Sequence, residues 1–128
     1  MHTTLRKQIL VVDDEPGVLL LLQHFLGEAF DVFTAENGRR AFDWLNAGNL
    51  PHLVLTDIEM PEMDGYELLR RLRADAAFVD VRCWMVSGKN KNLHYLRAMR
   101  LGAGGFIAKP FTAAEINRKL MLFSETTH

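Results

Sequence analysis

Short apolar runs alternate with longer amphipathic segments, and this alternation constrains the fold more than any other feature of the chain. The apolar runs are Ile9–Val12, Val32–Ala35, Leu53–Thr56, Cys83–Val86 and Phe106–Ala108. They are short, nearly continuous and often β-branched or aromatic, which is typical of strands buried on both faces of a parallel sheet.

The segments between these runs predict five amphipathic helices. Their apolar positions recur three or four residues apart, at Val18, Leu22, Phe25, Leu26 and Ala29; Ala41 and Leu45; Leu68, Leu69 and Leu72; Leu93, Leu96 and Met99; and Ala113, Ile116, Leu120 and Phe123. Residues typical of helix starts and ends punctuate them, namely Pro16, Gly38, Gly65 and Thr112, then Gly48 and Gly102. Strict alternation of five strands and five helices predicts an α/β fold with a doubly wound parallel sheet, right-handed crossovers and helices on both faces.

Length and composition fit a single domain. The 128 residues suffice for one core, expected over about residues 6–123, with flexible ends at 1–5 and 124–128. The net charge of −1 gives no overall attraction to nucleic acid or membranes, and no apolar run approaches the roughly 20 residues that span a bilayer. The single cysteine, Cys83, excludes an internal disulfide and fits a reducing compartment, so we expect a cytoplasmic protein.

Polar residues follow the predicted strands, and in open parallel sheets the working site lies beyond the carboxyl ends of the strands. These residues are Asp13, Asp14 and Glu15; Glu36 and Asn37; Asp57; Ser87 and Gly88; and Lys109. We expect them to converge on one edge of the sheet. The three aspartates offer hard oxygen ligands without a nearby imidazole or thiolate, which suits Mg²⁺, with Mn²⁺ as a substitute.

Lys109 and Ser87 complete a set of groups suited to phosphoryl chemistry. An ammonium group binds phosphate oxygens or pairs with Asp57, and a hydroxyl hydrogen-bonds to the same phosphate. A carboxylate with these partners beside a divalent cation is equipped to become an aspartyl phosphate. Structural roles stay open for each residue: Asp13 or Asp14 as a helix cap, Asp57 in a loop, Lys109 as a solvated side chain, and Ser87 in a turn.

Four stretches carry a resemblance to a known family: "VVDDEPG", "LTDIEMPEMDG", "MVSGK" and "LGAGGFIAKPF". In this order they resemble the signature stretches of the response-regulator receiver domain of two-component phosphorelay signalling, in its chemotaxis-regulator-like form. The resemblance implies a flavodoxin-like fold with strand order 2-1-3-4-5. It also implies a phosphoacceptor signalling domain, phosphorylated by a histidine kinase or a histidine phosphotransfer protein and slow to dephosphorylate itself, rather than a conventional enzyme.

The resemblance assigns the metal ligands and the phosphoacceptor. Asp57 would accept the phosphoryl group and, with Asp14, ligate Mg²⁺ directly. The backbone carbonyl of Glu59 would be a further ligand, and Asp13 would hold the ion through water.

The resemblance also assigns a phosphoryl-binding pair and a switch. Lys109 and Ser87 would bind the phosphoryl group, and Ser87 would move toward it. Phe106, where the family often has tyrosine, would swing inward in response. Pro110 would follow a cis peptide bond.

Glu59 and Lys89 each lie two residues beyond a key site residue, Asp57 or Ser87. Positions like these line the path of the hydrolytic water in the resembled family. We expect the two side chains to pair across the site and slow autodephosphorylation. Two solvated side chains are the alternative, since exposed ion pairs contribute little.

Basic residues dominate the last third of the chain. From Val86 to Phe123 there are seven lysines and arginines and one acid, Glu115. Apart from Lys109 they fall on the last two helices, the output face in the resembled family, where we expect an acidic downstream protein or a phosphorylation-dependent homodimer. A solvated basic face is the alternative. Direct nucleic-acid binding is not expected, because no recognition motif or aromatic platform is present.

Three other functions compete with a phosphorylated switch. A haloacid-dehalogenase-type phosphatase also forms an aspartyl phosphate, but that family has a second aspartate where this chain has Glu59. A flavin carrier needs a phosphate-binding loop after the first strand, where Asp13, Asp14 and Glu15 would repel phosphate. A phosphorylation-independent interaction module on the same fold is the main alternative.

Overall fold

Five parallel strands form one sheet in the order β2-β1-β3-β4-β5. The computed structural model describes residues 6–88 and 91–126. The strands are β1 (Gln8–Val12), β2 (Asp31–Ala35), β3 (Leu53–Asp57), β4 (Arg82–Ser87) and β5 (Gly105–Ala108). The expected strand order is therefore confirmed.

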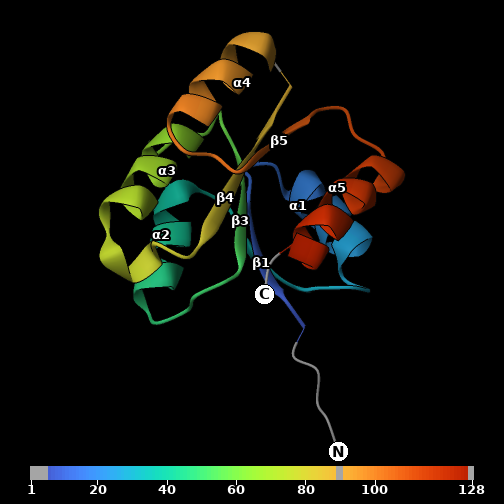
Figure 1. Ribbon diagram of the computed structural model, residues 1–128, viewed down its shortest axis with the longest axis horizontal. Helices are drawn as coiled ribbons and strands as arrows, with labels where there is room; N and C mark the ends of the chain where they lie inside the picture. Colours follow the sequence, from blue (N-terminus) through green and yellow to red (C-terminus); the bar gives the residue numbers. More distant parts are fainter. Residues whose placement is uncertain (1–5, 89–90, 127–128) are drawn as a thin grey trace, which may run out of the picture.

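Helices cover both faces of this sheet. They are α1 (Pro16–Leu26), α2 (Gly38–Asn46), α3 (Gly65–Ala74), α4 (Lys91–Arg100) and α5 (Ala113–Thr126), with a short 3₁₀ helix η1 (Ala76–Phe78) that sequence analysis did not predict. Helices α1 and α5 lie on one face, and α2, α3 and α4 lie on the other (Figure 1). The predicted doubly wound α/β fold is confirmed. Among the described helices, none is long and apolar enough to cross a membrane.

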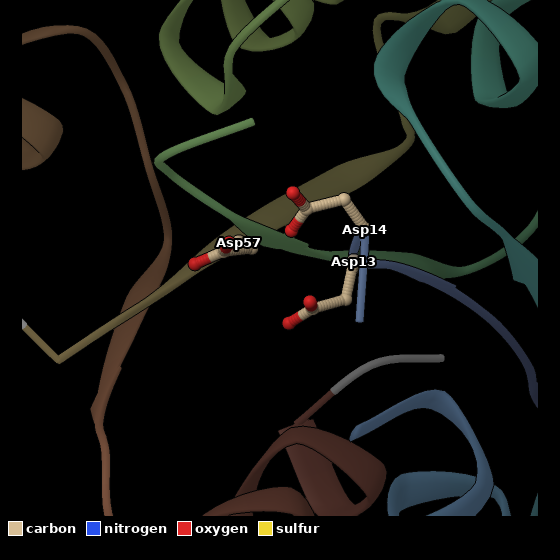
Figure 2. A group of neighbouring side chains, drawn as sticks. All are labelled: Asp13, Asp14 and Asp57. Atoms are coloured by element: carbon tan, nitrogen blue, oxygen red, sulfur yellow. The ribbon is translucent and has the colours of Figure 1, made fainter. Parts of the chain in front are cut away.

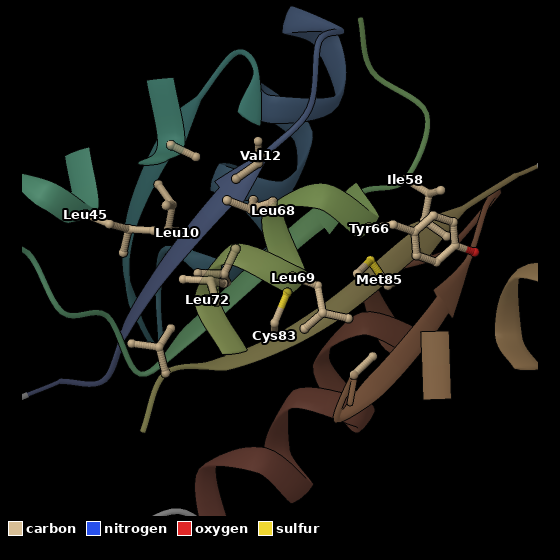
Figure 3. Close-up of a cluster of buried hydrophobic side chains, with 14 of the residues drawn as sticks. Leu10, Val12, Leu45, Ile58, Tyr66, Leu68, Leu69, Leu72, Cys83 and Met85 are labelled. Atoms are coloured by element: carbon tan, nitrogen blue, oxygen red, sulfur yellow. The ribbon is translucent and has the colours of Figure 1, made fainter. Parts of the chain in front are cut away.

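The central strands supply both layers of the core. On β1, Leu10 and Val12 face the α2–α3–α4 layer, whereas Ile9 and Val11 face the α1–α5 layer. Ile9, Leu10 and Val11 are 0% exposed, and burial of such side chains contributes roughly 1.5–3 kcal/mol each. Figure 3 shows the first of these layers, packed between β1, β3, β4 and α3. This rigid centre fixes the ends of β1 and β3 relative to one another.

Local signals fix the helix ends. Asn37 accepts a hydrogen bond from the Arg40 N–H at 2.8 Å, and Asp64 accepts one from the Glu67 N–H at 2.9 Å, so both side chains cap a helix start. Gly65 opens α3 against the end of β3, where a Cβ would lie 2.5 Å from the Asp57 carbonyl oxygen. Glycine at this position therefore lets α3 begin directly beside the phosphoacceptor candidate.

The apolar face predicted for α4, Leu93, Leu96 and Met99, is wrong in part. Leu93 is 70% exposed and Leu96 is 56% exposed, whereas Met99 packs against the core beside the fully buried Ala98. Helix α4 lies near the edge of the sheet, where a narrow contact around Ala98 is enough to hold it. The regular spacing of Leu93 and Leu96 therefore marks a solvent-facing apolar stripe. A smaller difference is Ala29, which lies beyond the end of α1 and is exposed.

Candidate functional site

Three carboxylates meet at the carboxyl edge of the sheet. Strand β1 pairs with β3, with Val12 opposite Thr56, so Asp13 and Asp14 lie beside Asp57 at the end of β3. One carboxylate oxygen from each of the three aspartates lies within 4.8 Å of those of the other two. Figure 2 shows these side chains reaching from the ends of the two strands to the same side. Asp13 and Asp57 are 1% and 7% exposed, whereas Asp14 is open to solvent.

Lys109 supplies the cation of this cluster. Its Nζ lies 3.1 Å from Asp13 Oδ2 and 3.4 Å from Asp57 Oδ1. The Lys109 backbone N–H donates to the Ser87 carbonyl at 2.8 Å, which extends the β4–β5 pairing and fixes where the side chain starts. The Lys109–Pro110 bond is cis, as the resemblance implied.

Burial and neighbouring charges shift the pKa values of Asp57 and Lys109, which face each other. Burial raises the pKa of Asp57 to about 6, and the Asp13 and Asp14 charges add to this, while Lys109 works against it. Burial lowers the pKa of Lys109, but its hydrogen bond to Asp13 and the charge of Asp57 outweigh that effect and leave the pKa raised. One ammonium group therefore does not balance the acids around it.

The donor set fits Mg²⁺. Every candidate ligand is a carboxylate or carbonyl oxygen, and the surplus negative charge favours a divalent cation. Asp13 already uses one oxygen to accept the Glu15 N–H at 2.9 Å and the other to accept Lys109. That bond to Glu15 precedes α1, and the residue at the helix cap is Glu15, whose side chain makes no capping bond. Asp13 is therefore not the cap of α1, and helix capping explains none of the three aspartates.

A cavity of about 250 Å³ opens over Asp57. Its lining consists of Asp14, Glu15, Asp57, Glu59, Ser87, Gly88 and Lys109. The structure thus brings together the residues predicted at the ends of β1, β3, β4 and β5, whereas Glu36 and Asn37, after β2, do not line this cavity. Two larger surface grooves lie away from Asp13, Asp14 and Asp57. One, of about 510 Å³, lies beside α3, and the other, of about 420 Å³, runs along α4, β5 and α5.

Ser87 lines this cavity, whereas Phe106 packs against α4. Ser87 ends β4 and is 2% exposed. Phe106 pairs with Met85 along β5 and is half-buried, with its ring edge-on to Tyr95 of α4 at 5.8 Å between centroids. The ring therefore lies between the sheet and α4, where a change of rotamer would alter the packing of that helix.

Glu59 meets a residue that sequence analysis did not select. Its side chain is 50% exposed, and its Oε1 lies 3.5 Å from Nε2 of His94 on α4. Lys89, the expected partner of Glu59, lies outside the described residues, so that pairing stays a prediction. A signal for His94 did exist, because His94, Ala98 and Leu101 are spaced as the inward face of a helix.

Comparison with known proteins agrees with this geometry. Residues 9–121 match the family described as the response regulator receiver domain. The chain is 37% identical over 110 residues to Response regulator Rre1 of Synechocystis, covering 84% of this chain and 47% of that protein. It is 30% identical over 115 residues to Chemotaxis protein CheY1 of Helicobacter pylori, covering 88% of this chain and 93% of CheY1. The chain thus spans about half the length of one relative and most of the other.

Solved structures support the same assignment. The signal receiver domain of a signal transduction histidine kinase from Syntrophus aciditrophicus superimposes with a TM-score of 0.83 at 29% identity, covering 95% of this chain and 93% of that one. The family match, over residues 9–121, includes all three aspartates of the cluster. This chain belongs to the response regulator receiver domain family of two-component signalling.

Proposed function

We propose that this receiver domain accepts a phosphoryl group on Asp57 in a Mg²⁺-dependent reaction and transmits the change to the face formed by α4, β5 and α5. The observation that carries the proposal is the geometry around Asp57. A nearly buried carboxylate lies 3.4 Å from an ammonium group, with oxygens of two further aspartates within 4.8 Å. Such a site neutralises and orients the charge of a transferring phosphoryl group.

The reaction begins with a phosphohistidine on a histidine kinase or a phosphotransfer protein. An Asp57 oxygen attacks phosphorus, the phosphorus–nitrogen bond breaks, and the imidazole leaves with that electron pair and takes a proton from water. Lys109 holds the oxygens of Asp57 and of the phosphoryl group, and the Ser87 hydroxyl donates to a phosphoryl oxygen. Asp13, Asp14 and Asp57, with the Glu59 carbonyl, would hold Mg²⁺, which offsets the negative charge on the transferring oxygens.

The output face has the properties of a docking surface. Leu93, Leu96 and Leu122 are 70%, 56% and 62% exposed, and a groove of about 420 Å³ runs between α4, β5 and α5. Exposed Arg100 and Arg118 add positive charge. Phosphorylation would bias this face through Ser87 and Phe106, toward an acidic downstream protein or a second copy of the domain. Binding of such a partner is expected to weaken as salt is added.

The test is the intact mass of the protein after incubation with acetyl phosphate and Mg²⁺. Wild type should gain the mass of one phosphoryl group, and it should fail to do so in chelator. Asp57→Asn should gain nothing, whereas Asp43→Asn, an exposed acid on α2, should behave as wild type.

Two results would overturn the proposal. Equal phosphorylation of Asp57→Asn and wild type would place the phosphoryl group elsewhere. Failure of folded wild type to accept a phosphoryl group from both acetyl phosphate and a panel of phosphorylated histidine kinases would favour a phosphorylation-independent interaction module.

A further inference from the structure

His94 takes an inward position on α4 where an apolar residue would be expected. Its side chain is 16% exposed, and the next inward position, one helical turn on, is the fully buried Ala98. The imidazole lies between Tyr66 of α3 and Glu59 of the loop after β3. It therefore joins three separate segments beside the Asp57 cavity.

The Tyr66 hydroxyl and the Glu59 carboxylate are the two neighbours that bear on which ring nitrogen of His94 carries the proton. It lies 2.6 Å from His94 Nδ1 and 3.3 Å from the His94 carbonyl oxygen. A carboxylate can only accept a hydrogen bond, so the tautomer of the neutral ring that satisfies both Tyr66 and Glu59 accepts the phenol proton at Nδ1 and carries its own proton on Nε2. Nε2 is the atom that faces Glu59 Oε1, at 3.5 Å.

Tyr66 itself is firmly held. It is 1% exposed, and the Arg97 guanidinium lies 4.2 Å above its ring. Figure 3 shows the ring at one end of the buried cluster, with its hydroxyl directed away from that cluster. Burial raises the pKa of Tyr66, which keeps the phenol protonated and able to donate.

We propose that His94 is a positioning residue for the Glu59 carboxylate, holding it from α4 at the rim of the Asp57 cavity. The proposal rests on the function proposed above, because the cavity matters only if Asp57 is phosphorylated. Without this hold, a half-exposed glutamate would turn toward solvent, driven by side-chain entropy and by repulsion from Asp14 and Asp57.

The held carboxylate places a negative charge at the mouth of the cavity. Glu59 lines that cavity together with Asp14 and Asp57. Its charge opposes the approach of anionic phosphodonors, and its bulk restricts the water that would hydrolyse the acyl phosphate. His94 thereby slows phosphorylation by small donors and lengthens the life of the phosphorylated state.

Two substitutions of His94 separate its two contacts. In His94→Gln the terminal amide nitrogen lies near the place of Nε2, so a donor toward Glu59 is retained while the acceptor for Tyr66 is lost. In His94→Asn the shorter amide replaces Nδ1, so the acceptor for Tyr66 is retained while the donor toward Glu59 is lost.

Rates of acetyl phosphate uptake and of autodephosphorylation test the proposal. His94→Asn should raise both about two- to fivefold, the size expected for one partly exposed charge, and His94→Gln should restore wild-type rates. Glu59→Ala, which removes both the charge and the bulk, should match His94→Asn, and adding His94→Asn to Glu59→Ala should change nothing further. Wild-type rates for His94→Asn, or an effect of His94→Asn that persists without the Glu59 side chain, would overturn the proposal.

A second measurement keeps this test separate from that of phosphorylation itself. If wild type accepts no phosphoryl group, the proposed function fails, and nitrogen NMR of the His94 ring decides the geometry alone. The expected result is a proton on Nε2 in wild type and a mixture of tautomers in Tyr66→Phe. A proton fixed on Nδ1 would remove the contact to Glu59 and with it the proposal.

Discussion

Asp57 combines burial with repulsion from neighbouring acids, and this sets how the metal-free protein responds to pH. Its pKa rises from 3.8 to about 6 on folding. Between these values the folded state binds a proton that the unfolded state has lost. Stability therefore decreases as pH rises through this window, and the cost is fully present above it.

Replacement of Asp57 by asparagine should accordingly stabilise the metal-free protein. In chelator near neutral pH, Asp57→Asn should raise the free energy of unfolding by about 1–3 kcal/mol, because a shift of one pKa unit corresponds to about 1.4 kcal/mol. The gain should shrink toward pH 4. Urea unfolding at both pH values measures it, with Asp43→Asn as the exposed control; a less stable Asp57→Asn near neutral pH would contradict the burial argument.

For individual residues, part of the site could be predicted from the sequence and part could not. The strand-end rule identified Asp13, Asp14, Asp57 and Lys109, because residues after neighbouring parallel strands must share one edge of the sheet. His94 was missed because its position depends on the rotation of α4. The spacing of His94, Ala98 and Leu101 competes with that of Leu93 and Leu96, and packing against Tyr66 and the sheet decides which set faces inward.

Among the elements, β5 begins with Gly105, and the sequence alone did not show why a glycine is needed there. Gly105 pairs with Trp84, and a Cβ on Gly105 would lie 2.6 Å from Trp84 Cδ2. The indole also packs edge-on against Phe123 of α5, at 5.9 Å between ring centroids. Glycine at this position therefore leaves room for an indole that joins β4 to α5.

Gly105→Ala should consequently destabilise the fold by about 1–3 kcal/mol, the usual cost of overpacking. Gly17→Ala on α1 is the matched control, because a Cβ there would meet no atom within 4 Å, and alanine favours a helix by up to about 1 kcal/mol over glycine. Thermal unfolding compares the two variants. Equal stability of Gly105→Ala and wild type would mean that the indole moves aside freely.

The elements also show where periodicity stops being informative. Five strands and five helices follow from alternation, but the strand order came from family resemblance, since several orders satisfy the same pattern. On α4, Leu93 and Leu96 repeat with helical spacing yet face solvent. Periodicity identifies a stripe, and the surface against which the helix packs decides whether that stripe is buried.

Across the whole molecule, Cys83 reports on the integrity of the core. It lies on β4 within the α2–α3–α4 layer, is 1% exposed, and burial raises the pKa of its thiol to about 12. The thiolate needed for reaction therefore forms only when the layer opens.

A thiol reagent should label Cys83 at a rate that follows the equilibrium population of unfolded protein. Labelling should be very slow in buffer and should accelerate with urea in parallel with the unfolding transition. Kinetics of thiol modification, compared with fluorescence of the same samples, measure this. Rapid labelling without denaturant would show that β4 opens locally, contrary to its central position in the sheet.

Under the proposed function, the fold has to distinguish Asp57 from the two other carboxylates, of which Asp14 lines the same cavity but is open to solvent. Asp57 lines the same cavity as Ser87 and Lys109, whereas Asp13 is held by the Glu15 N–H and by Lys109. Borohydride reduces an acyl phosphate to an alcohol and so marks the accepting aspartate as homoserine.

The most direct measurement is therefore peptide mass spectrometry after phosphorylation with acetyl phosphate and Mg²⁺ and reduction with borohydride. Homoserine at residue 57, and at neither 13 nor 14, is the predicted result. Homoserine at residue 13 or 14, or an unmodified residue 57 in protein that carries the phosphoryl mass, would contradict the assignment of Asp57 as the phosphoacceptor.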